Sequence, residues 1–159
     1  GLPDIPKATA KVAVEVPGLV ELPEDLARYV LVGAPQNHAG TNDPCRGTPP
    51  ASRHPQNHFG QPRLNTAVVA IAERTLQETG ILLRVNDMSL VRGGLFDIRN
   101  NWISPHSGHR IGLNADIGFS GVRNGACVDY DRQRLEETVR EVNRRRPRIE
   151  SDHFHVSLE

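Results

Sequence analysis

Apolar and polar residues alternate loosely from residue 10 to residue 32, and a period of two predicts short β-strands. Pro17–Gly18 and Pro23 interrupt this pattern and divide it into two or three strands. The strands belong either to the main domain or to the end of a preceding β-module. We therefore expect an N-terminal β segment over residues 1–33 and a main domain over residues 34–159.

Two later segments repeat their apolar residues every three or four positions, which predicts amphipathic helices. Asn65 is a good N-cap for the first of these helices, and Gly80 provides its C-terminal stop. The second helix begins after Asp129 or Asp131, either of which can cap it, and Pro147 terminates it. Residues 34–63, before the first helix, are rich in proline, glycine, asparagine and histidine and lack a period, which predicts a long loop that is either functional, as a wall of a cleft, or disordered.

Apolar runs between and after the helices predict further strands. Ile81–Val85 has the composition of a buried strand, and Leu95–Ile98 is a candidate for a short one. Leu113–Phe119 alternates, so that Asp116 lies on the face opposite the apolar residues, and His153–Leu158 is the last strand. The order of strands, helix, strands, helix and strand predicts an α+β domain whose helices pack on a mostly antiparallel central sheet.

The charge and the cysteines limit the possible environments and partners. The 19 basic residues balance the 19 acidic residues, so nothing in the composition favours nucleic acid, and no apolar run reaches the ~20 residues of a membrane span. Cys45 and Cys127 lack the paired spacing of a zinc ribbon. They form either one disulfide, which suits an oxidising compartment, or two free thiols, which suit the cytosol.

Histidines and one aspartate gather in two short stretches of the chain. His153 and His155 lie two residues apart on a strand and therefore point to the same face. If the two strands are neighbours, His109, Asp116 and one histidine of that pair converge. Two imidazoles and one carboxylate suit Zn²⁺, and three protein ligands leave a fourth position for water, which is the arrangement of catalytic zinc sites. The alternative is a set of surface histidines with a strand-capping aspartate.

The stretches HSGHRIGLNADIGF, DHFHVSL and NDMSLVRGG resemble the penicillin-insensitive murein endopeptidases. These belong to a zinc-peptidase superfamily with lysostaphin, the D-Ala-D-Ala carboxypeptidases and the hedgehog signalling domain, whose fold the resemblance also implies. The superfamily motif is a histidine, six residues, an aspartate, and a distant HxH pair. The resemblance implies that His109, Asp116 and His155 bind zinc, that His153 acts beside the metal, and that His106 is a further pocket residue.

One position departs from the murein endopeptidases, which have a histidine where this chain has Glu150. Other branches of the superfamily use a glutamate near the HxH as general base, so Glu150 is our candidate for that role. Asp152 is the alternative, but strand alternation turns it away from His153 and His155.

Three more residues near the motif are candidates for substrate binding. Arg92 and Arg110 carry the charge that binds carboxylates of a peptidoglycan stem peptide, and Trp102 can stack on substrate if it is exposed. Structural ion pairs and core packing are the competing interpretations of these residues.

The leading hypothesis is a secreted or periplasmic zinc peptidase that hydrolyses a cross-link or stem peptide of peptidoglycan. A zinc-binding, hedgehog-like interaction module that does not hydrolyse is the alternative. A metal-free cell-wall-binding domain is a third hypothesis.

Overall fold

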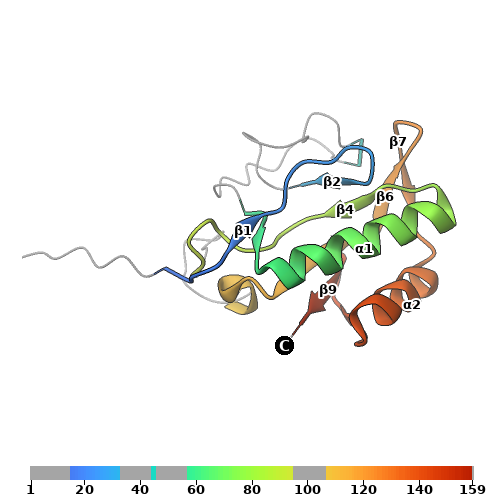
Figure 1. Ribbon diagram of the computed structural model, residues 1–159. Helices are drawn as coiled ribbons and strands as arrows, with labels where there is room; N and C mark the ends of the chain where they lie inside the picture. Colours follow the sequence, from blue (N-terminus) through green and yellow to red (C-terminus); the bar gives the residue numbers. More distant parts are fainter. Residues whose placement is uncertain (1–14, 33–43, 46–56, 95–106, 159) are drawn as a thin grey trace, which may run out of the picture.

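The computed structural model describes residues 15–32, 44–45, 57–94 and 107–158, which form a central sheet with two helices (Figure 1). The central sheet has five strands, in the order β2 (Tyr29–Leu31), β4 (Leu83–Val85), β5 (Asn114–Gly118), β9 (His153–Ser157) and β8 (Arg148–Ile149). The pair β2–β4 is parallel, and every other pair in this sheet is antiparallel. The predicted α+β fold with a mostly antiparallel sheet is therefore confirmed.

Strand β2 comes from the N-terminal segment, yet its three residues are buried and pair with β4. It is thus an integral edge of the central sheet. Strand β1 (Val20–Glu21) pairs instead with β3 (Phe59–Gly60) in a small second sheet. The domain boundary at residue 33 remains a prediction.

A hairpin that the sequence analysis did not predict follows β5. It consists of β6 (Ser120–Arg123) and β7 (Ala126–Asp129). Asn124 and Gly125 form its turn with φ angles of 53° and 75°. Positive φ at both turn residues matches the twist of a two-residue hairpin, for which Asn-Gly is a favoured sequence.

Helix α1 (Pro62–Thr79) starts earlier than predicted. Gln61 is the N-cap residue and Pro62 occupies the first turn, where its missing N–H costs no hydrogen bond. The prediction of Asn65 as N-cap was wrong, because Asn65 lies inside the helix and its Nδ2 donates to Val20 O at 3.0 Å. The predicted stop at Gly80 is confirmed by its left-handed conformation, with φ 70°.

Helix α2 (Arg132–Asn143) has the predicted N-cap, but its C-terminal end differs from the prediction. Asp131 accepts a hydrogen bond from Arg134 N at 3.1 Å. The helix ends before Pro147, because Arg144 adopts the left-handed conformation with φ 61° and acts as C-cap. Pro147 therefore does not terminate the helix, as had been expected.

The main core lies between the helices and one face of the central sheet. Leu64 and Val68 of α1 and Leu135 of α2 belong to the same buried cluster as Ile117 of β5 and Phe154 of β9. Because side chains alternate along a strand, the neighbours of these strand residues point to the opposite face. The helices thus leave the other face of β5 and β9 available for a site.

Cys45 and Cys127 form a disulfide whose Cα atoms are 4.7 Å apart. The bond ties Cys45 to strand β7, and Cys45 also packs against the small apolar cluster of Val30 and Val122. Of the two alternatives that the sequence left open for these cysteines, the structure shows the disulfide. Residues 95–98, for which a short strand was predicted, lie outside the described part of the chain.

Within the described residues, no helix combines the length and the apolarity that a bilayer crossing requires.

Candidate active site

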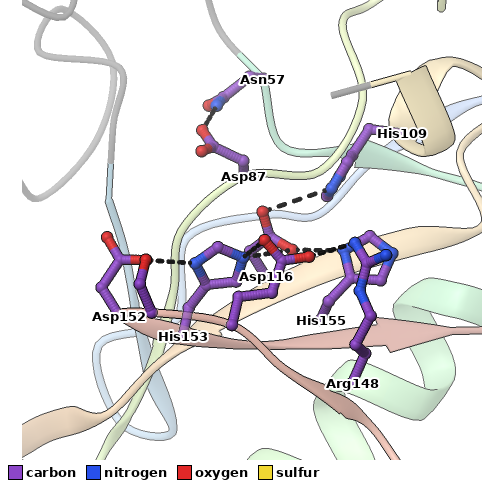
Figure 2. Close-up of polar contacts among 10 residues, drawn as sticks. Asn57, Asp87, His109, Asp116, Arg148, Asp152, His153 and His155 are labelled. Atoms are coloured by element: carbon purple, nitrogen blue, oxygen red, sulfur yellow. Dashed lines mark hydrogen bonds and ion pairs between the residues drawn. The ribbon is translucent and has the colours of Figure 1, made fainter. Parts of the chain in front are cut away.

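Adjacent strands bring two of the predicted ligands together. In the pair β5–β9, Asp116 lies opposite His155, and Gly118 lies opposite His153. The side chains of Asp116, His153 and His155 project from the face of the sheet that the helices do not cover, as Figure 2 shows. The backbone on both sides of Asp116 is also held, because its N–H donates to Asp87 O at 2.8 Å and its carbonyl accepts from Asn86 N at 2.7 Å.

A short 3-10 helix, η2 (Ser107–Ile111), delivers the third predicted ligand. The chain leaves η2 through Gly112, which has a φ of 71°, and enters β5 two residues later. The carbonyl of Gly112 accepts from Gln61 N at 2.8 Å, and a Cβ at Gly112 would lie 2.2 Å from Leu19 Cδ2. Glycine is therefore required here by conformation and by space. As a result His109 is held over the sheet with 1% of its surface exposed.

His109, Asp116 and His155 meet at one point. Asp116 Oδ2 lies 3.3 Å from His109 Nε2, and Asp116 Oδ1 lies 2.9 Å from His155 Nδ1 (Figure 2). One nitrogen of each imidazole and one carboxylate oxygen all lie within 4.8 Å of one another. The two rings are nearly perpendicular, with centroids 5.1 Å apart.

Asp116 and His109 stabilise each other's charged forms. Burial raises the pKa of Asp116, but hydrogen bonds with His109 and His155 outweigh it and hold this pKa well below its usual range. Burial lowers the pKa of His109, but Asp116 outweighs it, and Asp87 and a hydrogen bond with the Met88 backbone also help to raise this pKa. Asp116 is therefore an ionised carboxylate at neutral pH.

His153 stands beside this group with carboxylates on both sides of its ring. Its Nε2 lies 3.4 Å from Asp116 Oδ1 and 3.6 Å from Glu150 Oε2, and its Nδ1 lies 2.8 Å from Asp152 Oδ1 (Figure 2). Asp152 was expected to point away from this histidine, but it precedes β9 and strand alternation does not govern its side chain. The Asp152 side chain is 80% exposed, whereas that of Glu150 is 29% exposed. Glu150 also belongs to a second group of possible metal ligands with His153 and His155.

The other predicted site residues are less well placed by the structure. His106 and Trp102 lie outside the described residues. Arg92 and Arg110 are exposed, and their carbonyls accept backbone hydrogen bonds from Val16 and from the Gly93–Gly94 turn. Their part in substrate binding remains a prediction.

Three residues around the site, Asn57, Asp87 and Arg148, had no predicted role. Asn57 donates to the carboxylate of Asp87, whose charge acts on His109 (Figure 2). Arg148 contacts Glu150 from β8. Arg148 and Glu150 are two residues apart, a spacing that signals a shared face only once strand β8, which was not predicted, is known. The contact of Asn57 with Asp87 left no comparable signal in the sequence.

The residues present fit a divalent cation. Two imidazole nitrogens and a carboxylate oxygen are the ligand types that zinc and similar ions prefer, and the carboxylate is already ionised. Asp116 and His155 lie on paired strands, so hydrogen bonds of the sheet fix their spacing, and η2 adds His109.

Together these features define a class, because two imidazoles that converge on a buried carboxylate are a ligand set of hydrolytic metalloenzymes. The chain belongs to the penicillin-insensitive murein endopeptidase family, whose model matches residues 51–159. The match covers the three candidate ligands and more than half of the chain. Membership of this family supports a peptidase activity on murein, the peptidoglycan of the bacterial cell wall. No curated protein matches the chain.

Proposed function

We propose that this protein is a zinc-dependent peptidase that hydrolyses a peptide bond in a cross-link or stem peptide of peptidoglycan. The observation that carries the proposal is the convergence of His109, Asp116 and His155, whose ligand atoms lie within 4.8 Å of one another on a face free of the helices. Family membership supports the substrate class.

His109 Nε2, an oxygen of Asp116 and His155 Nδ1 are the atoms that would hold the ion. When bound, zinc supplies Lewis acidity, which activates water and polarises the carbonyl of the scissile bond. Asp116 brings one full negative charge to the set, and burial of His109 keeps competing water away from that side.

Glu150 is the proposed general base. Its Oε2 accepts a proton from the attacking water and returns a proton to the leaving amine, so that the peptide C–N bond breaks as the new C–O bond forms. His153 is proposed to donate a hydrogen bond from Nε2 to the developing oxyanion. Both groups are partly exposed beside the buried ligand set, which allows contact with a substrate.

The cellular location belongs to the same proposal. A disulfide between Cys45 and Cys127 suits an oxidising compartment, and peptidoglycan lies outside the cytoplasmic membrane. We therefore place the protein in the bacterial envelope, secreted or periplasmic. His106, Trp102, Arg92 and Arg110 are proposed to take part in substrate binding.

The test uses purified peptidoglycan and protein loaded with Zn²⁺. Wild type should release new amino termini, and Glu150→Gln should lower the rate by about a hundredfold or more, because one proton-transfer group is lost. Glu150→Gln should keep its zinc, as measured by elemental analysis. Zinc binding without release of amino termini by wild type would contradict the proposal and favour a non-hydrolysing module. Mass spectrometry of the fragments would identify the bond.

A further inference from the structure

We infer that Arg148 is a positioning residue for the catalytic carboxylate of Glu150. The inference rests on the proposed function, because it concerns the group that we assign as general base. Arg148 itself lies outside the sequence motif of histidines and an aspartate.

The register of the sheet places Arg148 at the edge of the site. In the pair β8–β9, Arg148 lies opposite His155, and Ile149 lies opposite Phe154. Phe154 is in the main core, so Ile149 is on the helix side of the sheet and Arg148 shares the opposite face with His155. Glu150 lies two residues beyond Arg148, and its side chain also reaches the site, where Oε2 lies near His153 Nε2.

The contacts divide the two oxygens of the carboxylate. Arg148 Nη2 contacts Glu150 Oε1, while Glu150 Oε2 lies 3.6 Å from His153 Nε2. The guanidinium of Arg148 thus pairs with Oε1 of Glu150, while Oε2 remains directed toward the site. A planar guanidinium restricts the carboxylate in direction as well as in distance, which a lysine ammonium does less well.

Glu150 needs such a restraint because it follows strand β8, which holds it only weakly. Strand β8 has only two residues, lies at the edge of the sheet, and has side chains that are exposed. The backbone of Glu150 is fixed by its hydrogen bond to His153 O at 2.9 Å, but its side chain has three rotatable bonds of its own. An exposed ion pair adds little to folding stability, so the value of the Arg148 contact lies in orientation.

The experiment compares steady-state kinetics of zinc-loaded variants on a soluble cross-linked peptidoglycan fragment. Arg148→Met should lower kcat by about tenfold with KM nearly unchanged, because a displaced base slows the chemical step. Arg148→Lys should recover part of the loss. Arg146→Met is the matched control, because the Arg146 side chain is equally exposed, at 69%, and pairs with Glu136 of α2. It should keep kcat and KM.

A double-mutant cycle separates this inference from the proposed function. If Arg148 acts through Glu150, Arg148→Met should have no further effect on kcat in a Glu150→Gln background. An equal loss in that background, a change in KM alone, or full kcat in Arg148→Met would each overturn the inference and leave Glu150 as base. Full turnover by Glu150→Gln alone would instead refute the base assignment, and Arg148 would then have no base to position. If Arg148→Met does not fold, Arg148→Lys decides the question by its kcat.

Discussion

His153 and His155 face the same carboxylate from one strand, but they stand in different surroundings. His155 Nδ1 lies 2.9 Å from Asp116, within the group that includes the buried His109. His153 lies farther from Asp116, at 3.4 Å, and its ring contacts the carboxylates of Glu150 and Asp152. This difference supports separate roles, with His155 as a metal ligand and His153 as a group that meets the substrate.

We therefore expect different losses from two matched alanine substitutions. His155→Ala should lose zinc and all measurable turnover, because two protein ligands remain. His153→Ala should keep zinc and lose about a hundredfold or more in kcat, as is typical when an oxyanion donor is removed. Elemental analysis and turnover on the same preparations measure both effects. Loss of zinc by His153→Ala would show that the division between the two histidines is wrong.

At the scale of single residues, the sequence predicted which side chains meet but not how deeply they are buried. Strand alternation correctly turned Asp116 away from the apolar residues of β5, yet Asp116 is only 2% exposed. The reason is that His109 and the backbone of Asp87 cover it, and both belong to other parts of the chain. A local sequence pattern predicts the face to which a side chain points. The burial of that side chain depends on packing with residues that are distant in the sequence.

The two helices are joined by a network of charged groups centred on Glu78 of α1. Glu78 accepts from Arg74 Nε at 2.9 Å within its own helix and from Arg134 Nε of α2 at 3.0 Å. Thr138 of α2 adds a third hydrogen bond at 3.4 Å. The hydrogen bond from Arg74 and the charge of Arg134 lower the pKa of Glu78.

Glu78→Gln should destabilise the protein by about 0.5–1 kcal/mol at pH 7, the usual range for exposed pairs in a network. A lowered pKa stabilises the folded state above the unfolded pKa of about 4.3, and this stabilisation is lost as the pH falls through the folded pKa. The difference between wild type and variant should therefore shrink toward pH 3. Urea unfolding of both proteins at pH 7 and pH 3 measures it.

The control for this prediction is Glu137→Gln, because Glu137 of α2 interacts with the neutral Gln133. It should change stability less than Glu78→Gln. A loss in Glu78→Gln that is the same at both pH values would show that packing, and not charge, causes the effect.

The elements themselves were predicted unevenly, for identifiable reasons. Helix periodicity predicted both helices, but α1 begins earlier than predicted. Its start is marked by Pro62 in the first turn and not by Asn65. The hairpin β6–β7 was missed although Asn124–Gly125 is a strong turn signal. The parallel pairing of β2 with β4 was not predicted, although a strand, a helix and a following strand are the signal of a parallel βαβ unit.

At the scale of the molecule, the disulfide joins parts of the chain that are far apart in sequence. Cys45 and Cys127 are separated by 82 residues, and the enclosed segment contains α1, β4, η2 and β5. A bond that closes so long a loop restricts the unfolded chain strongly, which stabilises the folded state by about 4 kcal/mol in the chain-entropy description. The loop includes His109 and Asp116, so its stability also affects the site.

Reduction should therefore lower the free energy of unfolding of the metal-free protein by about 4 kcal/mol, a large part of the ~5–15 kcal/mol typical of a domain. Urea unfolding with and without a strong reductant measures this change. The double variant Cys45→Ala with Cys127→Ala is the control, because it should be as unstable as the reduced protein and insensitive to reductant. Equal stability of the oxidised and reduced wild type would contradict the prediction. A protein that depends on this bond keeps its full stability only where thiols are oxidised, as they are outside the cytoplasmic membrane where its peptidoglycan substrate lies.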